Sequence, residues 1–501
     1  MTTPDHPHRV VVVGGGVTGL VAARRLAQQG HSVTLVELAD RVGGQVHTVR
    51  LGTRWVDVGA EALHLGAPPA RRLVSELGLA DGVIGSRPGQ SWLWSGHRLR
   101  ALPAGVTPSG PTRLRPVVTS GVMSVRGLGR AGLEPLAARL RPALAADEDV
   151  SVGEFISSRF GREVTAQFID PLLGSLHAGD VHRLSLRACT PSLADAATRR
   201  RSLVRRRPAP APSPSEQPAL PLFASWQGGL RTLTDALLAD VPVTVRLGHR
   251  VERLDRTPSG YIVELRATTA RTSDSNRTDS TDSTVSLDAD AVVLAIPASA
   301  AGRLIAPHSS RAARMLAGTE VARVATVVLG FDPSVTRGTR ALAGTGILLP
   351  STTGMLLKAA THLSRKWPQF ADDDLCLVRL SAGRSRDDLL DTLSDEELVA
   401  RLVDEFGTVS GIDAAPEVLH VQRWSGGLPQ LQVGHHARLA AVREEIGRDL
   451  PGVVLAGSAY DGLGLASCIA SAEAAAAAVS PGSVAPVAPV APVAPTTAVR
   501  A

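Results

Sequence analysis

The chain has 501 residues, of which 44% are hydrophobic and 20% are charged, and its formal net charge is +6. These values predict a globular protein of two or three domains and exclude a chain that is disordered throughout. No run of about 18 apolar residues, the length that crosses a bilayer as a helix, occurs in the sequence.

Cysteine use and the type of positive charge narrow the class of protein further. The cysteines, Cys189, Cys376 and Cys468, are widely spaced, so we expect a cytoplasmic protein with neither a disulfide framework nor a metal site. Arginine carries almost all of the positive charge, because Lys358 and Lys366 are the only lysines. Basic and aromatic residues are not interleaved, so nucleic acid is not an expected partner. Arginine binds carboxylates well, which favours an acidic small molecule.

The opening segment has the pattern of a dinucleotide-binding βαβ unit. Residues 10–13 are four valines, which predict a buried strand, and Gly14, Gly16 and Gly19 then form a G-x-G-x-x-G turn. We expect a helix from about residue 17 that ends at Gly30 and directs its free N–H groups at a diphosphate. A glycine-rich turn without a ligand is the alternative interpretation.

The residues after the next predicted strand indicate which dinucleotide is bound. That strand ends at Glu37, whose carboxylate can accept hydrogen bonds from both hydroxyls of a ribose. The following Glu37-x-x-x-Arg41-x-Gly43-Gly44 pattern resembles the second signature of the FAD-dependent amine oxidase superfamily. The resemblance implies that the glycines pass close to the FAD diphosphate and that the arginine supplies charge beside them. Gln45 departs from the Arg or Lys that many members carry there.

The next segments narrow the resemblance to one branch. Residues 55–62 read as a strand followed by a loop of small residues, which in the superfamily lies against the flavin ring; a plain strand end is the alternative. After a predicted helix over 68–77 and a hairpin over 92–99, the Leu-Pro-x-Gly loop at 102–105 is similar to the protoporphyrinogen and coproporphyrinogen oxidases. In that branch the region matching 107–144, which we expect to be helical, caps the substrate pocket. Contact with a membrane and an ordinary amphipathic subdomain both stay open.

The middle of the chain continues this resemblance. Residues 151–163 and 170–185 resemble the branch's R-x-G-x-E helix, D-P-L turn and A-G-D loop. We expect His177 and His182 to be loop residues, since neither has convincing metal-ligand neighbours. Residues 205–218, rich in proline, alanine and serine, predict a linker.

Two segments in the second half of the chain are predicted to contact the cofactor. Residues 243–254 read as strand, turn and strand, and the resemblance places Val251 against the adenine. Polar residues 268–286 predict a flexible extension, and 291–297 a buried strand. Trp424 is implied to pack beside the flavin. A plain strand valine and an ordinary core tryptophan are the alternatives.

The last structured segment resembles the ending of the porphyrinogen oxidases. Residues 453–457 predict a strand ending in glycine, 458–464 a loop, and 466–479 an alanine-rich helix whose N–H groups face FAD. Ala466-Ser467 departs from the Pro-Asp of many relatives. Cys468 is expected to be a small helix residue rather than a reactive thiol.

Together these elements predict an α/β fold with discontinuous domains. We expect a Rossmann-like FAD-binding domain (1–90, 219–300 and 425–480), a helical subdomain over the substrate pocket (91–204), a linker (205–218), an α+β substrate-binding domain (301–424) and a disordered tail (481–501). The cofactor contacts that the glycine pattern and the resemblance imply are Gly14, Gly15, Gly16, Val17, Thr18, Gly19, Glu37, Leu38, Arg41, Gly43, Gly44, Gln45, Gly59, Ala60, Glu61, Ala62, Val251, Trp424, Gly457, Gly464, Leu465 and Ala466.

The resemblance implies the oxidation of a porphyrinogen by FAD, with dioxygen as acceptor and hydrogen peroxide as by-product. Removing a hydride from a methylene bridge requires that carbon to be positioned over the flavin in a dry pocket, so we expect no catalytic side chain. Four propionates on coproporphyrinogen III suit an arginine-rich entrance, which favours it over protoporphyrinogen IX. Amine or carotenoid oxidation, and a non-catalytic flavoprotein or scaffold, stay open. We expect a cytoplasmic enzyme; peripheral contact with the inner face of the membrane and a partner enzyme of haem synthesis also stay open.

Overall fold

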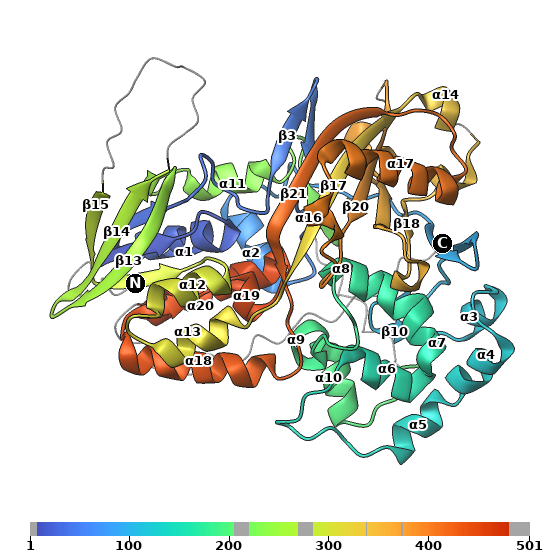
Figure 1. The fold of residues 1–501 in the computed structure, drawn as a ribbon, viewed down its shortest axis with the longest axis horizontal. Helices are drawn as coiled ribbons and strands as arrows, with labels where there is room; N and C mark the ends of the chain where they lie inside the picture. Colours follow the sequence, from blue (N-terminus) through green and yellow to red (C-terminus); the bar gives the residue numbers. More distant parts are fainter. Residues whose placement is uncertain (1–7, 205–219, 269–283, 337, 372–373, 480–501) are drawn as a thin grey trace.

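The computed structural model describes residues 8–204, 220–268, 284–336, 338–371 and 374–479. The predicted linker at 205–218, most of the extension at 268–286 and the tail from 481 lie outside these residues. The elements group into a parallel sheet with helices on its faces, a seven-stranded sheet and a helical lobe made from residues 115–198 (Figure 1). The expected α/β class is confirmed.

A five-stranded parallel sheet forms the base of the molecule. Its strands, in spatial order, are β12 (Val243–Arg246), β2 (Ser32–Val36), β1 (Arg9–Val13), β16 (Ala291–Leu294) and β22 (Val453–Leu455). The central strand β1 pairs on both sides, with Val11 opposite both Val292 and Thr34. A strand covered on both faces needs continuous apolar residues, which explains the run of four valines in β1.

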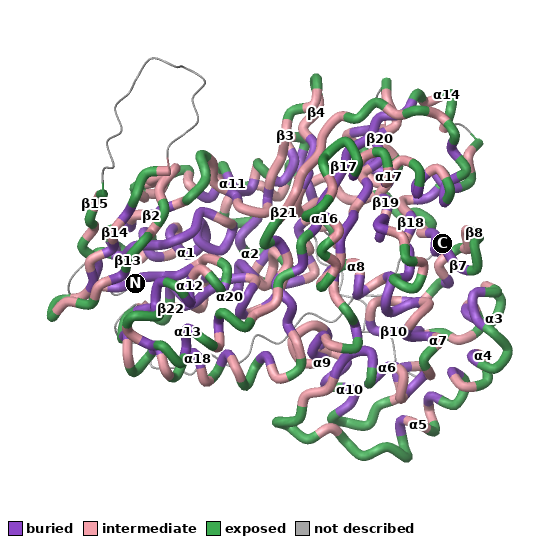
Figure 2. The backbone as a smooth tube through the Cα atoms, viewed as in Figure 1, coloured by how far each residue is buried: buried purple, intermediate pink, exposed green. Residues whose placement is uncertain are grey.

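Different layers cover the two faces of the parallel sheet. On one face α1 (Val17–Gln28) and α20 (Leu465–Val479), from opposite ends of the chain, share one hydrophobic core. On the other face lie the antiparallel strands β13 (His249–Thr257), β14 (Gly260–Ala267) and β15 (Thr284–Ala289), and the helices α12 (Ala298–Ile305), α13 (Ser310–Ala317) and α18 (His435–Asp449). Figure 2 shows the buried strands running between these layers.

The position of α12 and α13 corrects one predicted boundary. Residues from 301 onward were expected to belong to the substrate-binding domain, yet Ala312, Ala313 and Leu316 pack in the same core as the parallel sheet. The short, alanine-rich apolar stripe of α13 packs on α12 and α18 within this core, and these packing partners cannot be read from the helix itself.

The seven-stranded sheet combines five strands between residues 321 and 429 with two strands between residues 91 and 101. Its strands, in order, are β21 (Glu417–Pro429), β17 (Val321–Phe331), β20 (Cys376–Ala382), β19 (Leu357–His362), β18 (Gly346–Leu348), β7 (Ser91–Ser95) and β8 (Arg98–Ala101). All neighbours are antiparallel except β18 and β7, which are parallel. One face of the sheet packs on α17 (Asp395–Ser410).

The hairpin β7–β8 corrects a second boundary. Residues from 91 were assigned to the helical subdomain, but Trp92 pairs with Ile347 and Leu93 with Leu348, so the hairpin completes the seven-stranded sheet. The parallel pairing joins segments about 250 residues apart in the chain. Such long-range register leaves no local pattern in the sequence.

The helical lobe has its own apolar core. Its elements are α3 (Arg115–Thr119), α4 (Val125–Gly132), α5 (Glu134–Leu140), α6 (Val152–Phe160), α7 (Arg162–Val164), the π-helix η1 (Thr165–Gly174), α8 (Ser175–His177), α9 (Leu186–Cys189) and α10 (Pro191–Thr198). The expectation of a wholly helical segment over 107–144 is wrong at its start, where β9 (Val106–Thr107) pairs with β10 (Gly110–Pro111). The predicted turn at Asp170-Pro171-Leu172 lies inside η1, because Phe168, Ile169 and Leu173 bury that helix in the core.

The remaining elements connect these layers. They are β3 (Thr48–Leu51), β4 (Arg54–Asp57), β5 (Leu63–His64), α2 (Pro68–Glu76), β6 (Ile84–Gly85), β11 (Phe223–Ser225), α11 (Arg231–Leu238), α14 (Pro333–Thr336), η2 (Arg340–Ala343), η3 (Ser351–Thr353), α15 (Leu363–Lys366), η4 (Pro368–Phe370), α16 (Leu389–Thr392) and α19 (Ser458–Asp461).

Candidate functional site

The turn between β1 and α1 leaves no room for side chains. Gly14 has φ +104°, and a Cβ placed on it would lie 2.4 Å from the carbonyl oxygen of Ala295. A Cβ on Gly19 would lie 1.8 Å from the carbonyl oxygen of Gly14. No side chain of the described residues caps α1 after Gly16, and its first turn holds no acidic residue. The first N–H groups of the helix are therefore available to an anionic ligand.

The second glycine pair lies directly on this helix end. Gly43 forms an isolated parallel bridge with Gly16, and its N–H donates to the carbonyl oxygen of Gly15 at 2.7 Å. A Cβ on Gly44 would lie 3.0 Å from the Cα of Gly16. A larger residue at Gly44 would push the two segments apart, so the sequence pattern and the observed close approach agree.

Backbone groups hold the two charged side chains predicted here. The carboxylate of Glu37 accepts the N–H of Gly15 at 2.5 Å and that of Ala39 at 2.8 Å. A carboxylate offers about four acceptor positions, so Glu37 keeps capacity for a ribose hydroxyl. The guanidinium of Arg41 donates to carbonyl oxygens of its own turn, those of Val42, Gly44 and Val46. Arg41 therefore supports the glycine turn from within.

The strand predicted to reach the adenine starts beside Glu37. The N–H of His249 donates to the carbonyl oxygen of Glu37 at 3.0 Å. Val251 follows two residues later in β13, beside a bulge between Val251 and Arg253. Leu38, the residue after Glu37, is 49% exposed at this edge. The structure thus brings Leu38 and the beginning of β13 to the same end of the parallel sheet.

The C-terminal segment reaches the same point from the other end of the chain. Gly457 follows β22 with φ +121°, and a Cβ on it would lie 3.4 Å from Oγ1 of Thr18. The predicted loop at 458–464 is partly wrong, because Ser458–Asp461 forms the helical turn α19. Asp461 accepts a hydrogen bond from Ser471, which closes this turn on α20. Gly464, Leu465 and Ala466 form the start of α20, whose first turn holds no acidic residue.

The predicted cofactor contacts Gln45, Gly59 and Trp424 contact one another. The N–H of Ala60 donates to the carbonyl oxygen of Gln45 at 2.9 Å. A Cβ on Gly59 would lie 2.1 Å from that same oxygen and 2.9 Å from Cζ2 of Trp424. The side chain of Gln45 donates to the carbonyl oxygen of Gly427, which anchors it to β21 beside the tryptophan. The structure therefore joins the N-terminal loops to the seven-stranded sheet here.

Glu61 points away from the glycine turns and into a buried cationic network. Its carboxylate accepts from Nζ of Lys366 at 2.6 Å, from Nε1 of Trp367 at 2.9 Å, and from Arg379. Burial alone would raise the pKa of Glu61, but the charges of Arg379 and Lys366 hold that pKa at about 2. Arg379 also donates to the carbonyl oxygens of Asp57 and Gly59. The side chain of Glu61 thus fixes the loop and leaves only its backbone for a cofactor.

Sequence analysis missed the residues that hold this loop. Lys366, Trp367 and Arg379 were not singled out, and neither was Thr326, whose Oγ1 donates to the carbonyl oxygen of Val58 at 2.7 Å. One signal was present, because only two lysines stand among many arginines, at 358 and 366. No local pattern connects either lysine to Glu61.

The predicted loop histidines lie apart from any metal centre. His177 ends α8, is 6% exposed, and burial lowers its pKa to about 4, so the expectation of a loop residue is wrong for it. His182 lies in the loop before Ser185, and its N–H donates to Asp180. Among the described ranges no group of His, Cys, Asp and Glu could hold a metal ion.

These features together define a class of protein. The glycine turns, Glu37 and Gly457 all follow the carboxyl ends of parallel strands, which meet at one edge of the sheet. Dinucleotides bind at such an edge, with their phosphates on helix N-termini. The uncapped start of α1 and the open space beside Gly16, where a Cβ would meet only the Cα of Gly44 at 4.0 Å, fit an FAD diphosphate.

Comparison with known proteins agrees with this geometry. The Flavin containing amine oxidoreductase family matches residues 17–480. The chain is 33% identical to the coproporphyrinogen III oxidase of Mycobacterium tuberculosis, with 93% of this chain and 96% of the relative covered. It is 30% identical to that of Bacillus subtilis, with 94% and 97% covered. A solved structure from Exiguobacterium sp. 255-15 is 25% identical with a TM-score of 0.80, and covers 95% of this chain and 99% of its own.

The chain belongs to the flavin-containing amine oxidoreductase family. It is an FAD-dependent oxidoreductase, as the sequence resemblance implied. Its relatives are matched over nearly their whole length, so the seven-stranded sheet and the helical lobe belong to the shared fold.

Proposed function

We propose that this enzyme oxidises coproporphyrinogen III to coproporphyrin III, with dioxygen as acceptor and hydrogen peroxide as by-product, in haem biosynthesis. The observation that carries the proposal is the likeness to bacterial coproporphyrinogen III oxidases over more than nine-tenths of the chain. Protoporphyrinogen IX is the second candidate substrate, because it shares the reacting methylene bridges and differs in having two propionates rather than four.

We further propose that FAD is held by the residues predicted for it. These are Gly14, Gly15, Gly16, Val17, Thr18, Gly19, Glu37, Leu38, Arg41, Gly43, Gly44, Gln45, Gly59, Ala60, Glu61, Ala62, Val251, Trp424, Gly457, Gly464, Leu465 and Ala466. The helix starts and glycine turns support the assignment of the diphosphate, and Glu37 that of the ribose. The contacts among Gln45, Gly59 and Trp424 support the assignment of the ring.

The reaction requires positioning more than acid or base catalysis. The residues proposed above would hold FAD, which would supply the electron acceptor for C–H oxidation and the means of its reoxidation by dioxygen. Gly59 lets the loop lie directly against Gln45 and Trp424, and the side chain of Gln45 is bound to the carbonyl oxygen of Gly427 in the sheet. Arg379 fixes the loop at 58–62 by donating to the carbonyl oxygens of Asp57 and Gly59 and to the carboxylate of Glu61. We therefore assign no catalytic side chain to the chemical step.

The purified holoenzyme tests this function directly. Coproporphyrinogen III should bleach the flavin without oxygen and give fluorescent porphyrin with hydrogen peroxide in air. Faster turnover of protoporphyrinogen IX would overturn the choice of substrate. A holoenzyme that gives no porphyrin from either compound would favour amine or carotenoid oxidation, and a flavin that no such donor bleaches would indicate a non-catalytic flavoprotein.

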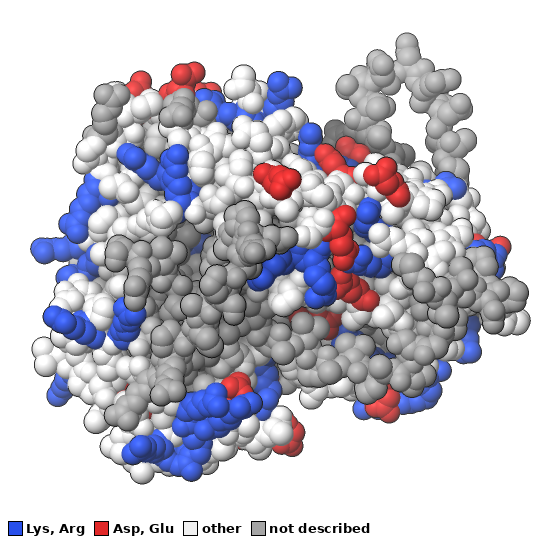
Figure 3. Space-filling model, turned by 180° about the vertical axis from the view of Figure 1, so that it is seen from behind, with Lys and Arg blue, Asp and Glu red and all other residues white. Residues whose placement is uncertain are grey.

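We also propose that the helical lobe touches a lipid surface at the cytoplasmic face of a membrane. Its outer helices expose large apolar side chains: Val118 (54%), Val125 (87%), Leu133 (53%), Leu136 (51%) and Leu140 (74%). Among the charged side chains that Figure 3 shows on the helical lobe, basic ones predominate. None of the helices that the structure describes is long and apolar enough to cross a membrane. Apolar side chains among basic ones favour binding to the surface of anionic lipid.

Vesicle sedimentation tests the lipid contact. The enzyme should pellet with phosphatidylglycerol vesicles, and Val125→Asp with Leu140→Asp should abolish this while activity in solution is kept. Val418→Asp, at a 44% exposed position on β21, is the matched control and should pellet normally. Equal binding by all variants would refute the proposal. If the parent protein did not sediment with any vesicle, a partner enzyme of haem synthesis would be the favoured ligand of these exposed apolar side chains.

A further inference from the structure

Lys358 is a buried lysine whose charge has no counterpart within the part of the chain that the structure describes. It is 4% exposed and lies in β19, at a register shift between Leu357 and Ala359. Among the described residues no acidic side chain forms an ion pair with its ammonium, and no hydrogen bond is formed by Nζ. Burying a cation without a partner is costly, so such a lysine is unusual unless a ligand supplies the partner.

The backbone around Lys358 is held on several sides. Glu405 of α17 accepts the N–H groups of Leu356 at 3.1 Å and Leu357 at 2.7 Å. The carbonyl oxygen of Lys358 accepts from the N–H of Leu349 at 3.0 Å and from Oγ of Ser175 at 3.4 Å. The position of the lysine is therefore set by the fold and is not a product of a mobile loop.

The charged neighbours of Lys358 lie on the face of the sheet opposite to α17. The charge of Arg379 acts on Lys358, and Arg379 is on that face because its neighbours in β20, Val378 and Leu380, pack in the core that includes α17. The residue after Lys358, Ala359, is opposite Ser381, which is opposite Thr326. Thr326 donates to the carbonyl oxygen of Val58, so this face of the sheet looks toward the loop at 58–62.

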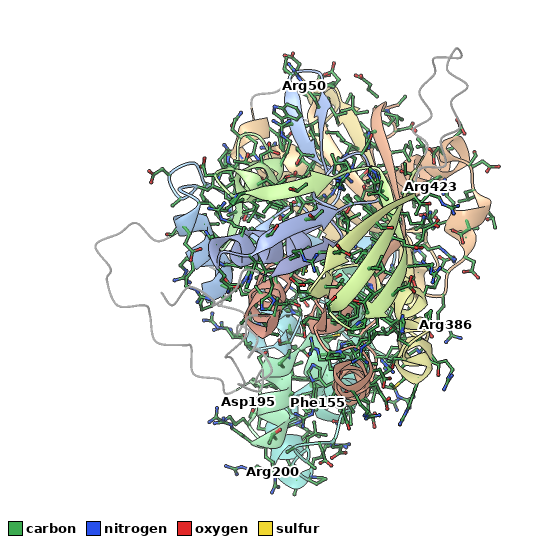
Figure 4. The ribbon with its side chains drawn as sticks, turned by 90° about the vertical axis from the view of Figure 1, so that its left-hand side faces the viewer. Arg50, Phe155, Asp195, Arg200, Arg386 and Arg423 are labelled. Atoms are coloured by element: carbon green, nitrogen blue, oxygen red, sulfur yellow. The ribbon has the colours of Figure 1, made fainter. Side chains whose placement is uncertain are left out.

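Positive charge predominates on this face. Burial, followed by the nearby charges of Arg384 and Arg379, lowers the pKa of Lys358 to about 7. Arg379 is neutralised by Glu61, while the guanidinium of Arg384 donates to the carbonyl oxygen of Leu349 at 3.2 Å. Arg386, which follows two residues later, points outward and is exposed (Figure 4).

Two acids, Asp170 and Asp387, attract the charge of Arg384, and both accept backbone N–H groups; Asp387 accepts that of Leu389 at 3.0 Å. Asp170 of η1 attracts the charge of Arg384, but its Oδ2 accepts the N–H of Ser351 at 2.6 Å. Lys358 and Arg384 are therefore neighbouring cations, and no described carboxylate pairs with Lys358. An added anion would satisfy both.

The distance from Trp424 indicates which part of a ligand Lys358 can reach. The strand order β21, β17, β20, β19 puts three strand spacings, about 14 Å, between the strand of Trp424 and that of Lys358. Lys358 is too far away to contact a group oxidised beside Trp424 and Gly59. It can contact the outer edge of a large substrate whose reacting carbon lies there.

We propose that Lys358, together with Arg384, binds a peripheral carboxylate of the substrate and so selects large polycarboxylate substrates. This inference rests on the proposed function and adds a residue that determines specificity. The ammonium of Lys358 donates a charged hydrogen bond to the substrate carboxylate. That carboxylate is the anionic partner that no described side chain provides.

The test compares an acid ligand with its neutral ester. Coproporphyrin III and its tetramethyl ester are titrated into the oxidised holoenzyme and binding is followed by quenching of porphyrin fluorescence. Lys358→Met should weaken binding of the acid by about tenfold or more and leave the ester unchanged. With coproporphyrinogen III the same variant should raise KM and keep kcat. Arg323→Met, which removes an exposed cation of the same sheet, should change none of these values.

The outcomes separate this inference from the proposed function. Equal weakening of acid and ester, or no weakening of either, overturns the role of Lys358 while turnover of coproporphyrinogen III by the parent enzyme upholds the function. A parent holoenzyme that neither binds coproporphyrin III nor oxidises its porphyrinogen overturns both. Lys358→Arg, which keeps the charge, should retain the preference for the acid, and its loss would also refute the inference.

Discussion

Replacing Glu61 with glutamine should destabilise the protein strongly, because this carboxylate is the shared partner of two partly buried cations, Arg379 and Lys366. Its oxygens accept from Lys366, Trp367 and Arg379. The side chains of Glu61 and Arg379 are 10% and 12% exposed, so water cannot replace the lost charge. Glutamine keeps the size of the side chain and removes only its charge, which leaves Lys366 and Arg379 uncompensated.

Two independent estimates give a similar magnitude. Removing one member of a buried ion pair typically costs about 3–5 kcal/mol. The lowering of the pKa of Glu61 from 4.5 to about 2 corresponds to about 3 kcal/mol at about 1.36 kcal/mol per unit. A lowered carboxyl pKa stabilises the fold above the unfolded pKa, and this contribution is lost as pH falls from about 4.5 toward 2. At pH 7 the whole contribution is present.

Urea unfolding of the holoenzyme at pH 7, followed by circular dichroism, measures this loss. The matched control is Glu320→Gln, which breaks the pair with Arg183 at 2.7 Å, where the side chains are 38% and 32% exposed. Solvent screening limits that pair to about 1 kcal/mol or less. We expect Glu61→Gln to lose about 3 kcal/mol. Similar losses in the two variants would refute the reasoning.

Three further predictions concern other buried groups. Burial raises the pKa of Asp57 to about 7, so its ionisation opposes folding. The stability of the parent should therefore fall relative to that of Asp57→Asn as pH rises from about 4 to 7. Melting temperatures of the two proteins that change equally over this pH range would contradict this. Gly19→Ala places a Cβ against the carbonyl oxygen of Gly14, so the purified variant should lack the flavin band near 450 nm, and a normal ratio of flavin to protein absorbance would disprove the steric argument. Glu134→Gln leaves Arg159 buried without its partner and should cost about 3 kcal/mol in urea unfolding, a prediction that a loss below about 1 kcal/mol would exclude.

The sequence by itself determined the features of this protein that depend only on residues close together in the chain. The four valines of β1, the glycines at 14, 16 and 19 and the acidic Glu37 lie within 30 residues, and each acts through its own conformation or its immediate neighbours. A glycine required by a positive φ or a close approach is visible as a glycine, and a doubly covered strand is visible as an apolar run. The pattern at the C-terminal glycine and α20 could be predicted for the same reason.

Only the tertiary structure decided how distant segments share their charges and strands. Glu61 pairs with Arg379, 318 residues away, and β7 pairs with β18, about 250 residues away. In neither pair does the local sequence of one member indicate the other. The turn predicted at Pro171 became a π-helix because its apolar neighbours are buried in the lobe. Lys358 is an ordinary lysine in the sequence; its lack of a partner comes from the strand order and burial that surround it. Pairing energies at long range depend on where the whole chain places each group, so they become readable only in the folded protein.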